Sequence, residues 1–142
     1  MSRVTVSVLI AAVIPVLIGG ARVVAAFADS DQHAGHEAVL ASEPLANIPG
    51  QQLTAVIVRY PPGGASPRHH HAGSVFAYVI SGAIRSENSA TGPARVYSAG
   101  ESFFEPAGSE HTVSANASAT EPAALLAVFV AERGAQLTTM DH

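Results

Sequence analysis

The stretch GGASPRHHHAGSVFAYVISG, residues 63–82, joins three consecutive histidines to a run of β-forming residues. Val, Ile, Phe and Tyr favour a strand, and the glycines and prolines around them favour turns. Successive side chains of a strand point to opposite faces, so His69 and His71 share one face and His70 lies on the other. His69 and His71 are then about 6.6 Å apart along the strand, close enough to bind one metal ion if another strand supplies a third ligand.

Similar β-type segments continue along the chain from Leu53. They are rich in Val, Ile, Phe and Tyr, and Gly, Pro or small polar residues separate most of them. The segments are LTAVIVRY, SVFAYVISG, ARVYSAG, ESFFEPAG, HTVSANAS and ALLAVFVAE. None has a helical repeat of apolar residues. The series predicts an all-β fold, for which a double-sheet jelly roll is one architecture that protects strand edges.

Length and composition limit the possible functions. The 142 residues are enough for one domain with one core. Seven arginines and no lysine stand against 11 acidic residues, and phosphate binding needs clustered positive charge, so we expect no nucleic-acid partner. A small-molecule ligand or substrate is expected instead. The absence of cysteine excludes disulfides and thiol catalysis and leaves His, carboxylate and hydroxyl groups for site chemistry.

Residues 1–28 have the pattern of a signal peptide. Arg3 precedes an apolar stretch from Val4 to Ile18, and Ala26-Phe27-Ala28 offers the small-x-small pattern that signal peptidase requires. The alternative is an uncleaved membrane anchor, but the apolar run is shorter than the roughly 20 residues that a span needs. We therefore predict a periplasmic or secreted protein that meets the membrane only through this segment.

The rest of the chain divides into a leader, a domain and a tail. Residues 29–50 are small and polar with little periodicity, which predicts a flexible leader. We predict that residues 51–137 form the β-barrel domain and that residues 138–142 form a C-terminal tail. The leader contains His33 and His36. Two histidines in a flexible segment are usually solvated, so they are not assigned to a site.

Two motifs in the chain resemble those of the cupin superfamily. The first family motif consists of Gly, His-x-His, Glu and Gly at fixed spacings. At the same spacings this chain has Gly63, His69-His70-His71, Val75 and Gly82. The second has Gly, Pro-x-Gly, His and Asn; Gly100, Pro106, Gly108 and His111 match it, whereas Asn116 falls one position late. The chain thus resembles the small single-domain cupins.

The resemblance implies a double-stranded β-helix, or jelly-roll barrel, with a metal centre. His111, after the Pro106–Gly108 turn, is the candidate third ligand beside His69 and His71. The implied cofactor is a divalent transition metal: Fe, Mn, Zn or Ni. The implied function is either an enzyme, such as a dioxygenase, isomerase or lyase, that acts on a small anionic or chelating molecule, or a non-catalytic ligand-binding or sensor protein. Similar cupins often form homodimers.

The chain departs from the family pattern at Val75, where most metal-binding cupins have a glutamate. A valine side chain cannot coordinate a metal. Three hypotheses follow: a three-histidine site, as in thiol dioxygenases of this superfamily; a carboxylate from elsewhere; or weak or lost metal binding. The candidates for a replacement carboxylate are Glu101, Glu105 and Glu110, although each is expected more often to be solvated or ion-paired.

Aromatic and arginine side chains are second-tier candidates. One or two of the aromatics are expected near the site and the others in the core; the candidates are Tyr60, Phe76, Tyr78, Phe103 and Phe104. Arg68 and Arg85 are able to clamp a carboxylate, but surface charges are the more common role for arginines in an acidic protein.

The signal-peptide assignment predicts that the exported protein begins at Asp29. The mature chain then carries 5 arginines against 11 acidic residues, a formal charge of −6 with His neutral. Intact-mass measurement of protein recovered from the periplasm or medium checks the N-terminus. A membrane-bound species that retains Met1 contradicts the assignment.

Overall fold

A computed structural model describes residues 34–141, so the predicted signal peptide lies outside the described residues. This part of the chain consists of strands and turns, as the sequence predicts, and contains no helix able to cross a membrane. The strands are β1 (His36–Pro44), β2 (Gln51–Tyr60), β3 (Ala65–Ser66), β4 (His69–His71), β5 (Ser74–Ser81), β6 (Ala83–Asn88), β7 (Gly92–Ser98), β8 (Ser102–Glu105), β9 (Glu110–Asn116), β10 (Ala123–Glu132) and β11 (Thr138–Met140).

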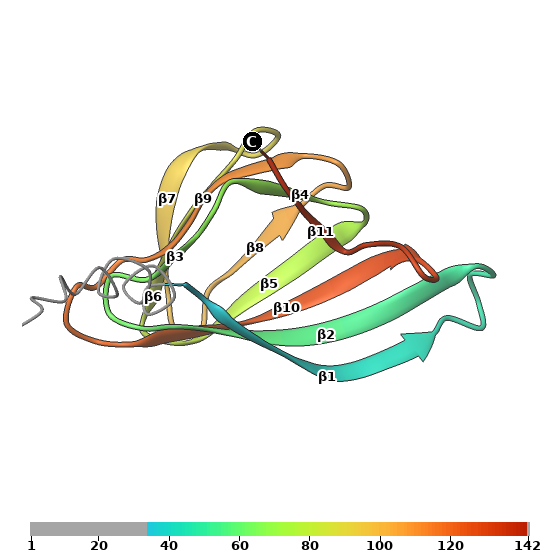
Figure 1. Ribbon diagram of the computed structural model, residues 1–142, viewed down its shortest axis with the longest axis horizontal. Helices are drawn as coiled ribbons and strands as arrows, with labels where there is room; N and C mark the ends of the chain where they lie inside the picture. The colour runs from blue at the N-terminus through green and yellow to red at the C-terminus, as the bar shows by residue number, and fades with distance from the viewer. Residues whose placement is uncertain (1–33, 142) are drawn as a thin grey trace, which may run out of the picture.

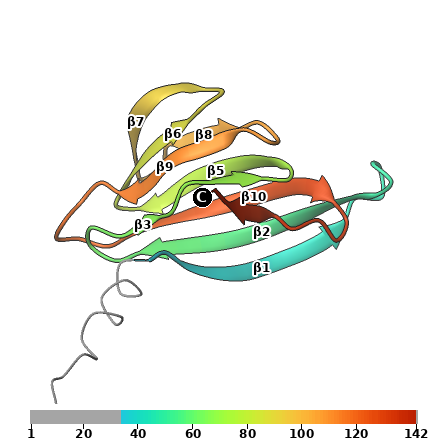
Figure 2. The ribbon, with the colours of Figure 1, turned by 45° about the horizontal axis from the view of Figure 1, so that its top comes forward.

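The strands form two antiparallel sheets. One has the order β1-β2-β10-β5-β8, and the other has the order β11-β4-β9-β6-β7, with β3 also paired to β9. Figures 1 and 2 show the long strands of the first sheet side by side and the second sheet lying against them. Neighbours in each sheet are mostly distant in sequence, so the chain crosses repeatedly between the sheets.

The core lies between the two sheets. Alternate residues of β2, β5 and β10 point inward, and Ile84 of β6 meets them from the other sheet. Val75 and Val79 of β5 are among the most deeply buried side chains, at 1% and 0% exposure. The six segments predicted to be β-type overlap β2, β5, β7, β8, β9 and β10, so β-favouring composition between turn residues identified these strands.

The predicted leader and tail boundaries need correction, because both segments contribute strands. β1, which lies within residues 29–50, pairs along its length with β2, and β11, within residues 138–142, pairs with β4. Every residue of β1 is exposed, so the strand has no buried face to produce a hydrophobic pattern. The two strands are held mainly by backbone hydrogen bonds, which leave no such trace in the sequence.

The outer face of the first sheet carries a group of exposed apolar side chains on β5 and β8. Phe76 and Phe104 are direct cross-strand partners, and Tyr78 and Ile80 follow on the same face of β5. All four are at least 41% exposed. Large apolar side chains gathered on one face of a soluble protein commonly mark an interaction surface.

Gly82, the last residue of the first motif, lies where the chain turns from β5 into β6. Its φ of 70° is in the left-handed region, and a Cβ there would lie 2.7 Å from the carbonyl oxygen of Pro122. Both conditions favour glycine. The motif residue therefore allows β5 and β6 to reach opposite sheets through one tight turn.

Candidate metal centre

The three histidines named from the sequence come together between β4 and β9. His69 and His71 are on one face of β4, and His111 of β9 is the direct cross-strand partner of His69. All three are buried, with exposures of 5%, 6% and 3%. One nitrogen from each ring lies within 4.8 Å of the corresponding nitrogens of the other two. The strand alternation predicted from the sequence thus leads to a compact imidazole cluster.

Backbone oxygens fix the orientation of His69 and His71. Nδ1 of His69 lies 2.6 Å from the carbonyl oxygen of Pro67, and Nδ1 of His71 lies 3.2 Å from that of Leu137. A carbonyl oxygen only accepts hydrogen bonds, so each Nδ1 carries the hydrogen and each Nε2 retains its lone pair. The Thr138 hydroxyl also lies 3.2 Å from Nδ1 of His71. The C-terminal segment therefore helps to orient this imidazole.

His111 has partners at both ring nitrogens. Its Nδ1 is 3.1 Å from Oε2 of Glu105, and its Nε2 is 2.9 Å from the Ser86 hydroxyl. The carboxylate accepts from Nδ1–H, and in the neutral ring the Ser86 hydroxyl donates to Nε2. Coordination of an ion by His111 would replace one of these two contacts.

Burial determines the protonation of the cluster. It lowers the pKa of His71 to about 4 and lowers the pKa of His69, because a charged imidazole is poorly solvated there. Burial alone would raise the pKa of Glu105, but the hydrogen bond from His111 and the nearby imidazoles hold it below its usual value. At neutral pH the site therefore has two neutral imidazoles, His69 and His71, able to act as ligands, beside one carboxylate.

The cluster forms part of the wall of a small, partly open cavity of about 40 Å³. Apolar residues of β2, β5 and β10 form much of the remaining wall, and a cluster of three hydroxyl groups adds a polar patch. In this cluster the hydroxyl of Tyr60 lies 2.7 Å from that of Ser66 and 2.9 Å from that of Ser114. The cavity is large enough for an ion with about one water molecule.

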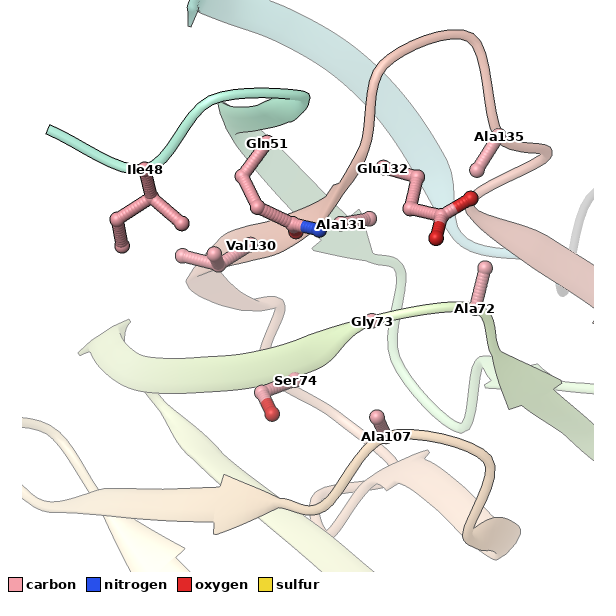
Figure 3. Close-up of a pocket in the computed structure, with 10 residues that line it drawn as sticks. All are labelled: Ile48, Gln51, Ala72, Gly73, Ser74, Ala107, Val130, Ala131, Glu132 and Ala135. Atoms are coloured by element: carbon pink, nitrogen blue, oxygen red, sulfur yellow. The ribbon is translucent and has the colours of Figure 1, made fainter. Parts of the chain in front are cut away.

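A wider hollow of about 540 Å³ lies at the surface and is shown in Figure 3. The hollow is open to solvent. It is lined by Ile48, Gln51, Ala72, Gly73, Ser74, Ala107, Val130, Ala131, Glu132 and Ala135. Glu132 is the one charged residue among them. The hollow contains none of the clustered histidines. The candidate chemistry therefore belongs to the smaller cavity.

Several residues considered from the sequence lie outside the cavity. His70 faces away from the cluster, and its Nδ1 is 2.7 Å from Oδ1 of Asp141. Arg68 forms a surface ion pair with Glu110. Arg85 is exposed, as is His36 at the start of β1. His33 lies outside the described residues.

The remaining carboxylates and the aromatics divide between the surface and the cavity. Glu101 is on the surface and pairs with Arg95, whereas Glu105 is only 3% exposed and contacts the histidines. Of the two roles expected for these glutamates, solvated or ion-paired, burial excludes the solvated one for Glu105. Tyr60 and Phe103 line the cavity, so two of the five candidate aromatics are at the site.

Sequence reasoning missed three polar residues of the site. Ser86 bonds to His111, Asn88 donates to the Ser109 hydroxyl and lies 3.5 Å from Glu105, and Ser114 belongs to the hydroxyl cluster. All three are buried. Ser86 and Asn88 point inward from β6, so this strand lacks the apolar alternation that would have revealed it. Small polar residues at alternate positions were the only available signal.

The donor set fits a divalent transition metal. Two of the three buried imidazoles have their Nδ1–H groups bound to backbone oxygens, an arrangement common among metal-ligating histidines. Imidazole suits Fe, Ni, Cu and Zn, and an adjacent carboxylate extends the range to Mn. The residues present therefore match the kind of metal that the sequence motifs imply.

Comparisons with known proteins agree with this architecture. Residues 56–129, more than half of the chain, match a family model described as "Cupin domain". No curated protein matches the chain. Among solved structures, a conserved protein with a double-stranded beta-helix domain from Klebsiella pneumoniae is 20% identical, with a TM-score of 0.59 over 80% of this chain and 94% of that one.

Two enzymes are also similar in fold. The DMSP lyase DddQ from Ruegeria pomeroyi is 20% identical, with a TM-score of 0.60 over 85% of this chain and 56% of that one. Oxalate decarboxylase from Bacillus subtilis is 23% identical, with a TM-score of 0.54 over 75% of this chain and 27% of that one. The chain thus spans little more than half of the lyase and about a quarter of the decarboxylase. These likenesses concern the fold alone.

The lowered pKa of His71 predicts acid destabilisation of chelator-treated protein. The unfolded chain takes up a proton near pH 6.5 and the folded chain only near pH 4, so His71 contributes stability above pH 6.5 that is lost as the pH falls towards 4. Between pH 7 and 5 the loss is about 2 kcal/mol. Thermal melts of wild type, His71→Gln and the control His70→Gln measure it. The loss should shrink in His71→Gln alone, and equal losses in all three contradict the assignment.

Proposed function

The chain belongs to the cupin family, and on that premise we propose that it binds one divalent transition metal, Fe, Mn, Zn or Ni, through His69, His71 and His111. The observation that carries this proposal is the convergence of three buried imidazoles, two of them held by backbone oxygens, at one cavity wall. Keeping three imidazoles in a core without a ligand costs desolvation free energy. A bound cation would offset that cost.

We propose that the metal serves an enzyme acting on a small anionic or chelating molecule, as a dioxygenase, isomerase or lyase. The bound metal would act as a Lewis acid and attract negative charge. The apolar wall of β10, with Leu125, Ala127 and Phe129, would exclude bulk water, and the Tyr60 hydroxyl would offer a hydrogen bond to a polar group of the ligand. The small volume of the cavity favours a substrate of few atoms.

A second candidate function is non-catalytic ligand binding, as a sensor or accessory protein. The cavity of about 40 Å³ favours it, because so small a space holds an ion and water more readily than a reacting substrate. Incubation of metal-loaded protein with small carboxylic acids, with and without dioxygen, separates the two functions. Product formation supports the enzyme, and saturable binding without product supports the sensor.

We propose that the protein acts in the periplasm or outside the cell. The support is the N-terminal pattern of Arg3, an apolar stretch and Ala26-Phe27-Ala28. Export would place the metal site where the ligand is taken from the external medium.

The metal assignment predicts different effects of substitution at neighbouring histidines. His71→Ala removes a ligand and should abolish stoichiometric metal binding, whereas His70→Ala should leave binding unchanged because His70 lies outside the cavity. Metal content after desalting and the metal-induced rise in melting temperature measure both. Wild type should gain about 2.7 kcal/mol at a free metal concentration a hundred times Kd. Equal losses in the two variants would mean that the three histidines do not share an ion.

We propose that the exposed apolar face of β5 and β8 packs against a second copy of the chain. Phe76 and Phe104 lie side by side there, and a homodimer would remove them from water. Phe76→Glu should convert dimer to monomer, and Val96→Glu, at an exposed valine on β7 of the other sheet, is the control. Sedimentation velocity measures both. A monomeric wild type, or a dimer that persists in Phe76→Glu, contradicts the proposal.

A further inference from the structure

The valine that breaks the first motif faces a carboxylate on the neighbouring strand. Val75 of β5 pairs directly with Glu105 of β8 in the antiparallel ladder. Directly opposite residues of such a pair project from the same face of the sheet. Both side chains are buried, at 1% and 3% exposure, and both line the cavity of the histidine cluster. The carboxylate missing from β5 is therefore present beside its expected position, on β8.

The distances from Glu105 to the imidazoles match those between two ligands of one ion. Its Oε2 lies 3.1 Å from Nδ1 of His111 and 3.6 Å from Nε2 of His71. Two adjacent ligand atoms that are each about 2.1 Å from an ion lie roughly 3.0 Å apart in octahedral coordination, which leaves positions open beside four protein ligands, and roughly 3.4 Å apart in tetrahedral coordination. When Nδ1 of His111 gives up its hydrogen bond to Glu105 and binds the ion, Glu105 lies at a co-ligand distance from two of the three histidines.

Among the described residues no arginine contacts the Glu105 carboxylate. Arg68 pairs with Glu110 and Arg95 pairs with Glu101, both at the surface. The contacts of the Glu105 carboxylate are His111, His71 and, at 3.5 Å, the Asn88 amide. Burial of a carboxylate costs hydration free energy, which the hydrogen bond from His111 offsets, and a metal ion at the imidazoles would take over this compensation of its charge.

We propose that Glu105 is the fourth protein ligand of the metal and replaces the carboxylate that other cupins carry at the position of Val75. The proposal rests on the proposed function of His69, His71 and His111 as metal ligands. Three neutral imidazoles and one carboxylate leave a dication with a net charge of +1. The site then still attracts an anionic substrate but holds its metal more firmly than three imidazoles alone.

The test measures binding of Co²⁺ alone, with no substrate. Glu105→Gln keeps the shape of the side chain and removes its charge, so Kd for Co²⁺ should rise about tenfold or more. The visible absorption spectrum of bound Co²⁺ should also change, because a ligand has been lost. Glu101→Gln, which removes a surface carboxylate from the same β7–β8 region, is the matched control and should change neither quantity.

An exchange of the two residues tests the position directly. Val75→Glu/Glu105→Val moves the carboxylate across the strand pair and keeps the total side-chain volume of the pair. It should recover Co²⁺ affinity to within a few-fold of wild type, whereas Glu105→Val alone should not. This comparison decides the question even if Glu105→Gln fails to fold.

Each outcome bears on the proposal separately from the proposed function. Unchanged Kd and spectrum in Glu105→Gln, with wild type binding Co²⁺ normally, overturns the role of Glu105 and leaves the three-histidine site intact. Weaker binding with an unchanged spectrum means that Glu105 only orients His111, and it also overturns the proposal. No Co²⁺ binding by wild type overturns both.

Discussion

The pairing of β4 with β9 is the interaction on which the rest of the site depends. It sets His69 opposite His111, and the pleat of β4 then places His71 on the same side. A shift of one residue in this register would turn both β4 ligands out of the cavity and bring His70 in. Because β4 has only three residues, its position also relies on β11 along its other edge. The C-terminal strand is thus structurally part of the site.

The site concentrates polar side chains in one part of the protein interior. His69, His71, Glu105, His111 and Ser114 are all buried around one cavity. An apolar core of the same volume would usually be at least as stable, because buried polar groups lose their hydration. Their hydrogen bonds recover part of this loss, and among the described residues only Oδ2 of Asp141 is a buried side-chain atom without a partner. Such a concentration of partly compensated groups indicates a binding function rather than a stabilising one.

Much of the fold and three of the site residues were predictable from the sequence. Strands with an apolar inward face, such as β2, β5 and β10, follow from alternation, and glycine and proline spacing located the turns before His69 and His111. Two kinds of feature were not predictable. β1 has no buried side chain, and β6 turns Ser86 and Asn88 inward, so neither has an apolar period. The position of Glu105 beside the histidines depends on the register of β5 with β8, which no local pattern contains.

The most direct test of a metal centre at the β4–β9 pair is an anomalous-difference map from crystals grown with Co²⁺. The account predicts one strong peak per chain, within bonding distance of imidazole nitrogens from His69, His71 and His111. A map with no peak among these three rings, in crystals whose protein binds Co²⁺ elsewhere or not at all, would contradict it.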